Sequence, residues 1–183
     1  MKAMRNFGFF LAVFVLFALA APHAHAASGP ALDADTTATL EHFYDEVPSG
    51  KKLVQEAKGV LVFPSVIKAG IGIGGEYGEG SLRIHGKTAD YYSTAAASIG
   101  FQLGAQKKSI IVLFMQDEAL RKFRESEGWK ASVDASIAVI TVGAGGEMDT
   151  AKLKEPIIGF IIGQKGLMYN LTLEGAKFTK LEK

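Results

Sequence analysis

Short apolar runs that alternate with glycine form the most prominent hydrophobic pattern in the chain. Residues 60–63 are continuously apolar, and glycine and isoleucine then alternate from residue 70 to residue 74. Alternate residues of a strand share a face, so this spacing predicts one bare face and one aliphatic face. Because glycine weakens a strand, the pattern also predicts that another segment or a ligand approaches the backbone closely. The close-packing positions predicted in this way are Gly70, Gly72, Gly74, Gly100 and Gly104.

Helical periodicity appears at three places. Residues 40–47 have apolar positions at i, i+3, i+4 and i+7, with Asp35 or Thr36 available as the helix cap. A second short helix is expected over residues 50–58. The pattern predicts a third helix over about residues 117–126, inserted between strands.

The remaining apolar segments predict β-strands that recur every ~8–12 residues. The expected strands are 60–63, 81–84, 90–98, 99–105, 109–115, 135–142, 157–162, 167–173 and 177–181, with turns at 85–87 and 164–166. This order favours an α+β fold with a strongly curved antiparallel, or barrel-like, sheet. Its glycine faces either let the sheet close on itself and accept the inserted helix, or form a surface lined by lipid.

The first 26 residues have the three parts of a secretory signal peptide. Lys2 and Arg5 supply a positive start, residues 7–21 are apolar, and Ala24 and Ala26 are the small residues that a signal peptidase reads. The apolar run is shorter than the ~20 residues of a membrane-spanning helix, and a retained anchor is the alternative. We expect cleavage after Ala26 and a periplasmic or secreted protein. The expected division is a signal peptide (1–26), a flexible lead-in with the first helix (27–47) and a main domain (48–183).

Charge and size limit the classes of partner. Removing 26 of the 183 residues leaves 157, which suits one domain with a sizeable core. Lys2 and Arg5 leave with the leader, so the 20 basic residues become 18 against 19 acidic ones, a net charge near −1. A near-neutral chain disfavours non-specific binding of nucleic acid. The absence of cysteine excludes disulfides and acylation at a cysteine.

Few residues have the pattern of a catalytic or metal site. The mature chain has two histidines, His42 and His85, and neither has a serine in a G-x-S-x-G context or a cysteine beside it. Glu76 and Glu79 could form an acid–base pair, but a solvated strand end explains them more simply. Residues 70–75 are not followed by the helix that would hold a phosphate. We therefore expect no enzymatic activity, no cofactor and no metal.

Lysines are the candidates for contact with an anionic surface. They are Lys51, Lys52, Lys58, Lys68, Lys107 and Lys108. One lysine near such a surface contributes ~1 kcal/mol, so the first four give roughly 4 kcal/mol, or about millimolar affinity. The first helix opposes this attraction, since its polar face carries Glu41, Asp45 and Glu46. Stable attachment to a membrane therefore needs apolar insertion or a lipid pocket as well.

Several motifs resemble the SYLF domain family. They are AKGVLVF (57–63), KAG (68–70), GEG (78–80), FQLGAQKKSIIVLFM (101–115), ALRKF (119–123), GWKASVDASIAVITVGAGG (128–146) and PIIGFIIGQKGLMYNLTLEGAKFTKL (156–181). The resemblance covers roughly residues 48–181, with the motifs in the family's order.

This resemblance implies lipid binding and no catalytic residues. Eukaryotic members bind phosphoinositides, some also bind actin filaments, and bacterial members are exported envelope proteins. Membrane binding by the eukaryotic members is attributed to a basic amphipathic segment that matches the two helices before Gly59, the first of which is acidic here. We expect a non-catalytic lipid-binding protein of the bacterial envelope, which binds phospholipid or docks peripherally on membrane. Actin is not an expected partner of a periplasmic protein.

The alternative is an envelope protein–protein interaction module that does not bind lipid. An exposed strand edge or the loop containing Trp129, the one tryptophan of the chain, would then meet an unknown protein partner.

Overall fold

Two long strands dominate the computed structural model, which describes residues 27–142, 151–166, 173 and 175–183. The expected signal peptide (1–26), the glycines at 143–146 and most of the expected strand 167–173 lie outside the described residues. Strand β1 is Gly59–Ile84 and strand β2 is Lys87–Phe114. The predicted turn at 85–87 is confirmed at the two residues between the strands, since His85 and Gly86 have φ of 50° and 77°.

The β1–β2 ribbon is continuous where the sequence predicted separate short strands. The two strands pair antiparallel from Gly59↔Phe114 to Ile84↔Lys87. Pro64 interrupts the apolar pattern but not the strand, because the register shifts between Phe63 and Val66. A bulge of this kind accommodates a residue that has no N–H to donate.

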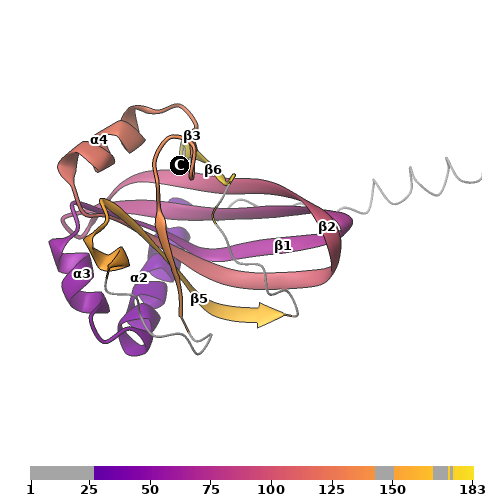
Figure 1. Cartoon of the computed structure of the whole chain (residues 1–183). Helices are drawn as coiled ribbons and strands as arrows, with labels where there is room; N and C mark the ends of the chain where they lie inside the picture. Colours follow the sequence, from indigo (N-terminus) through magenta and orange to yellow (C-terminus); the bar gives the residue numbers. More distant parts are fainter. Residues whose placement is uncertain (1–26, 143–150, 167–172, 174) are drawn as a thin grey trace, which may run out of the picture.

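The ribbon bends back on itself, so its two halves form two layers (Figure 1). The first layer contains residues 59–70 and 104–114, and the second contains residues 74–84 and 87–97. The layers touch through glycine: a Cβ added to Gly80 would lie 2.2 Å from the carbonyl oxygen of Val62.

Four shorter strands extend the sheet. These are β3 (Trp129–Lys130), β4 (Ala138–Thr141), β5 (Ile157–Gly166) and β6 (Lys177–Leu181). Within the described residues the sheet has six strands in the order β3-β6-β2-β5-β4, with β1 also paired to β2. All pairs are antiparallel except β4–β5. The predicted α+β class with a strongly curved sheet is confirmed.

Two local expectations for the later strands are wrong. The turn expected at 164–166 is strand, because β5 continues and Lys165 and Gly166 pair with Lys107 and Gln106. The strand expected over 135–142 is shorter, since β4 contains four residues, and Ile140 is the buried one among them.

The helices are α2 (Gly29–Glu46), α3 (Gly50–Glu56) and α4 (Asp117–Glu125), followed by a short 3-10 turn at Lys152–Lys154. The lead-in expected to be flexible is helical, and neither Asp35 nor Thr36 is the cap. The Ser28 side chain accepts a hydrogen bond from the Ala31 N–H, and Pro30 occupies the first turn, where its missing N–H costs nothing. Helix α4 lies where the sequence predicted it. No described helix is long and apolar enough to cross a bilayer.

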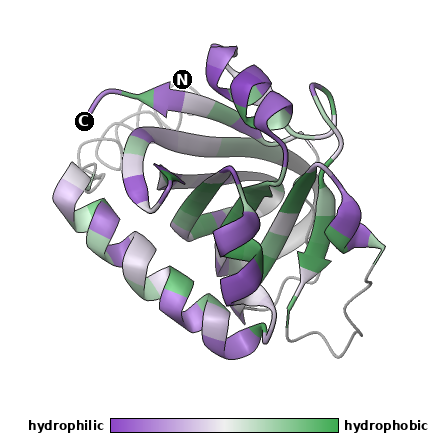
Figure 2. Cartoon of the chain, turned by 90° about the vertical axis from the view of Figure 1, so that its left-hand side faces the viewer, coloured by the Kyte–Doolittle hydropathy of each residue, from purple (hydrophilic) through white to green (hydrophobic). Residues whose placement is uncertain are grey.

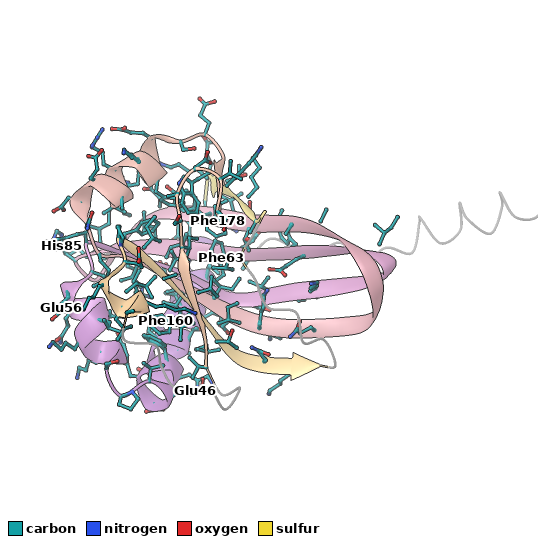
Figure 3. All side chains as sticks on the ribbon, in the orientation of Figure 1. Glu46, Glu56, Phe63, His85, Phe160 and Phe178 are labelled. Atoms are coloured by element: carbon teal, nitrogen blue, oxygen red, sulfur yellow. The ribbon has the colours of Figure 1, made fainter. Side chains whose placement is uncertain are left out.

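Two apolar clusters hold these elements together. One lies between the two layers and under α4, and Phe63 and Phe178 meet there with ring centroids 5.2 Å apart (Figure 3). The other lies between the first layer and helices α2 and α3, where Phe43 contacts Phe160 at 4.8 Å. Seen from the helix side, hydrophobic strands fill the centre and hydrophilic residues mark the helices (Figure 2). The burial of Trp129, which stacks on Phe178, means that it offers no exposed anchor to a partner.

Candidate functional site

The six candidate lysines fall into two separate groups. Lys51 and Lys52 are exposed on α3, and Lys58 precedes β1. Lys68 lies in β1, where it pairs with Gln106 of β2, and Lys107 and Lys108 follow Gln106 on that strand. The structure therefore does not bring the six together into one basic surface.

Acidic residues surround the first group. Lys52 lies 3.8 Å from Glu56, and Lys58 lies 3.9 Å from Asp117. Glu46 and Glu56 project from the outer surface at the helix end of the molecule (Figure 3). The helix end thus combines basic and acidic groups, and its attraction for an anionic membrane is weak.

The second group lies on a part of the ribbon with a different character. We name residues 66–77 and 95–108 the open half, and residues 59–63, 80–92 and 110–114 the helix-covered half. The helices gather around the helix-covered half, and the open half projects away from them (Figure 1). The sequence of the open half contains one acidic residue, Glu76.

The outer faces of the two layers are apolar and basic in the open half. Ile67 is 55% exposed, Ile73 is 73% exposed and Tyr77 is 53% exposed. Ile67 pairs with Lys107, and Lys107 pairs with Lys165 of β5, so these three exposed side chains form a row across three strands. Small exposed residues surround them, namely Ala69, Gly75, Ala95, Ala97 and Ala105.

The inner face of the open half is charged. Lys108 is 1% exposed, and its Nζ donates a hydrogen bond to Oε2 of Glu76 at 2.9 Å across the two layers. Lys68 and Gln106, which pair with each other, are also buried. The expectation that Glu76 marks a solvated strand end is therefore wrong, because the fold of the ribbon places it inside.

The open half thus reverses the usual arrangement of a half-buried strand. A one-sided sheet normally turns its apolar side chains inward and its polar side chains toward water. In the helix-covered half the in-facing residues are indeed apolar, for example Leu61, Phe63 and Leu82. The exposed apolar residues of the open half thus lie at one end of the ribbon, on the outer faces of both layers.

The predicted close-packing glycines have different surroundings. A Cβ on Gly70 would lie 2.3 Å from Cα of Gly74, so the backbone approaches itself closely where the ribbon bends. Gly104 has no atom within 4 Å of an added Cβ, and its φ of +137° shows that it is needed for backbone conformation instead. The surroundings of Gly72 and Gly100 lie outside what the structure describes.

A groove of about 330 Å³ lies between α2, α3 and the turn that joins β1 to β2. Its apolar lining includes Leu40, Val54 and Val60, with Arg83 and His85 at its side. The size suits part of one acyl chain, but the groove lies at the helix end, where acidic residues gather.

The candidate acid–base residues have structural partners. Glu76 is bound to Lys108, and Glu79 accepts hydrogen bonds from the Tyr77 hydroxyl at 2.9 Å and from Nζ of Lys183 at 2.8 Å. Burial alone would raise the pKa of Glu79, but these hydrogen bonds and the Lys183 charge hold it below the ordinary value. Among the described residues no group of histidines and carboxylates is arranged to hold a metal ion.

Comparison with known protein families supports the resemblance seen in the motifs. Residues 95–183 match the model of the Ysc84 family, described as "Las17-binding protein actin regulator". The match covers slightly less than half of the chain and is consistent with a SYLF domain. It begins in β2 and extends through all later elements. No curated protein matches the chain.

Ile67, Ile73, Tyr77 and Lys165 are the surface residues that the sequence did not single out. In the open half, residues of different character alternate along each strand, which shows that the strand has two different faces. The alternation does not show which face points inward. Lys107 and Lys108 illustrate the difficulty, because adjacent residues point to opposite faces and only one of them reaches the surface.

Proposed function

We propose that this protein is an exported, non-catalytic lipid-binding protein of the bacterial envelope that docks on membrane through the open half of the ribbon. The observation that carries the proposal is the reversed polarity of this half, with Ile67, Ile73 and Tyr77 outside and Glu76 and Lys108 inside. Tyrosine at the edge of an apolar surface suits the membrane–water interface, where one end of the side chain stays wet.

The binding free energy expected for the open half exceeds that of the lysines at the helix end. Because the exposed side chains lie on both layers, docking requires the end of the ribbon to insert, so that the outer faces of both layers meet lipid. Burying the exposed parts of Ile67, Ile73 and Tyr77 in this way contributes about 4 kcal/mol, and Lys107 and Lys165 contribute about 2 kcal/mol. The sum of about 6 kcal/mol corresponds to tens of micromolar affinity. Electrostatics alone at the helix end gives about millimolar affinity at best, and the acidic residues there reduce it further.

Two further parts of the proposal come from the sequence and the family. The signal-peptide pattern of residues 1–26 supports export. The family description names an actin regulator, but an exported bacterial protein would not meet actin, so we propose lipid as the partner. Both candidate carboxylates have structural partners, Lys108 for Glu76 and Tyr77 with Lys183 for Glu79, which supports a binding role rather than catalysis.

Co-sedimentation with phospholipid vesicles tests the proposal. The protein should bind vesicles that contain phosphatidylglycerol, and Ile73→Asp should lower this binding about tenfold because a carboxylate resists transfer to the interface. The matched control is Val133→Asp, since Val133 is 71% exposed but lies outside the ribbon. The control should leave binding unchanged.

Lysine variants separate the two ends of the molecule. Lys107→Glu should weaken binding to anionic vesicles, and Lys51→Glu on α3 should have less effect. Absence of vesicle binding by the unaltered protein, with no lipid in its native mass spectrum, would overturn the proposed function.

A further inference from the structure

We propose that the groove between α2, α3 and the β1–β2 turn binds a single-chain fatty acid, with the carboxylate at Arg83 and the acyl chain along the apolar lining. The inference rests on the lipid-binding function proposed above but uses a different site, in the helix-covered half of the ribbon. A single lipid molecule would enter this groove, whereas the open half would meet a bilayer.

Most of the lining surface of the groove is apolar. It includes Leu40 of α2, Val54 of α3, Ala57 at the end of α3 and Val60 of β1. The volume of about 330 Å³ is at the lower end of the range of small-molecule pockets. A groove of this size takes part of one acyl chain but not the two chains of a phospholipid.

The guanidinium of Arg83 is anchored through one of its nitrogens. Its Nη2 donates hydrogen bonds to the backbone oxygen of Asp33 at 2.8 Å and to Oγ1 of Thr37 at 2.7 Å. Within the described residues Nε and Nη1 donate no hydrogen bond, and Nε is buried. Arg83 therefore lines the groove in a fixed position with donors left for a ligand.

Arg83 also has no counter-ion in the part of the chain that the structure describes. The Asp33 carboxylate instead accepts hydrogen bonds from the hydroxyl groups of Thr88 at 2.8 Å and Tyr91 at 3.0 Å. The lining of the groove contains Arg83 and His85 and no acidic side chain. The charge of the groove is therefore complementary to an anionic headgroup.

The acidic residues of the helix end lie outside this lining. Glu41 and Asp45 are exposed on α2, and Glu56 is exposed on α3, at the same end of the molecule as His85 (Figure 3). Water and salt screen the repulsion between these side chains and an approaching anion, whereas a contact with the partly buried Arg83 is screened less. The arrangement therefore disfavours an anionic membrane surface and allows one small anionic ligand to enter.

Tyr44 offers a second donor close to Arg83. It lines the groove, and its hydroxyl makes no hydrogen bond within the described residues. Burial raises the pKa of Tyr44, and the charge of the nearby Arg83 opposes this shift. The hydroxyl therefore stays protonated at neutral pH and can donate to the same carboxylate that Arg83 binds.

Two matched amphiphiles test the charge of the headgroup. Dodecanoate and dodecyltrimethylammonium have the same chain length and opposite headgroup charges. In titration calorimetry below the concentrations at which they form micelles, we expect dodecanoate to bind at least tenfold more tightly, because Arg83 attracts only the anion. Equal affinities for the two amphiphiles would overturn the proposal.

Variants of the lining test the two parts of the groove. Arg83→Met should weaken dodecanoate binding about tenfold, the value of one charge-assisted hydrogen bond. The matched control is Arg121→Met, which removes an exposed arginine charge from α4 and should leave this binding unchanged. Ala57→Phe adds a ring to the lining without removing a polar contact and should weaken the binding of dodecanoate by filling the groove. Dodecanoate binding that neither Arg83→Met nor Ala57→Phe changes would overturn the proposal.

Vesicle binding separates this site from the proposed membrane surface. Ile73→Asp should lower vesicle binding and leave dodecanoate binding unchanged, and Ala57→Phe should do the reverse. Dodecanoate binding without any vesicle binding would overturn the membrane docking but not the groove site. Vesicle binding without any dodecanoate binding would overturn the groove site alone.

A direct measurement covers the case in which Arg83→Met does not fold. In the unaltered protein with labelled methyl groups, the NMR signals of Leu40, Val54 and Val60 should shift and saturate as dodecanoate is added. Shifts confined to Ile67 and Ile73 would place the amphiphile on the open half and overturn the proposal.

Discussion

The helix-covered half and the open half of the ribbon share one backbone ladder but place their side chains in opposite ways. In the helix-covered half Leu61, Phe63 and Leu82 face the interior, where they pack with aromatic rings from β6 and α4. In the open half the interior holds Glu76 and Lys108, and isoleucine and tyrosine face outward. The backbone pairing is regular in both halves, so it does not determine which face of the ribbon carries apolar side chains. What packs against each face differs between the halves. The helix-covered half therefore contains the apolar core, and the open half is the part that we propose meets the membrane.

The largest expected effect is on the free energy of unfolding in the helix-covered half. Phe63→Ala should lower it by about 3–5 kcal/mol, because Phe63 is fully buried and the cavity beside Phe178 cannot close. Ile67→Ala in the open half should change it by less than about 0.5 kcal/mol. Urea unfolding of the two variants measures both. A large loss of the free energy of unfolding in Ile67→Ala would show that Ile67 is covered in solution. The contrast between the two halves would then be wrong.

The buried ion pair gives the next effect. Glu76→Gln leaves the Lys108 ammonium buried without a counter-ion and should cost about 3 kcal/mol. The double variant Glu76→Leu with Lys108→Met should recover most of the loss, because two apolar groups of similar volume need no partner. Urea unfolding of the single and double variants forms the test. If Glu76→Gln leaves the free energy of unfolding unchanged, water reaches the inner face. The interior of the open half would then differ less from that of the helix-covered half.

Two glycines of the ribbon provide a matched pair with a smaller effect. Gly70→Ala should cost about 2 kcal/mol, since the new methyl group would meet backbone atoms of residues 73 and 74. Gly75→Ala should be nearly neutral, because no atom lies within 4 Å of its added Cβ. Thermal melting of both variants checks the difference. Equal melting temperatures would show that the bend of the ribbon is looser than the contact of Gly70 with Gly74 implies.

The smallest effect concerns pH at the boundary between the halves. The pKa of Glu79 is held below its ordinary value of 4.5, because hydrogen bonds from Lys183 and Tyr77 outweigh the opposing effect of burial. Its stabilising contribution is therefore present at neutral pH and is lost as the pH falls through the lowered pKa. Glu79→Gln should remove at most about 1 kcal/mol at neutral pH. Melting temperatures of the variant and the unaltered protein should converge in acid, and a constant difference would contradict this assignment.

Local patterns in the sequence predicted the parts of the fold that depend on neighbouring residues. The turn after Ile84, helix α4 and strand β6 were predicted correctly because turn residues, helical spacing and alternation act over a few positions. The start of α2 was missed although Ser28 and Pro30 form a recognisable helix start, since the apolar spacing that marked the helix begins only at Leu40. Breaks at Pro64 and at the glycines were overestimated, because pairing with β2 holds the strand across them.

The sequence by itself therefore determined the resemblance to the SYLF domain family, the fold class and the existence of two unlike faces along the ribbon. Only the tertiary structure decided which face is inside. A strand with period two is compatible with either orientation, and the choice depends on where the ribbon bends and on what packs against it. For this reason Lys68 and Lys108 could not be distinguished from Lys107 in the sequence, although the fold buries the first two and leaves the third at the surface.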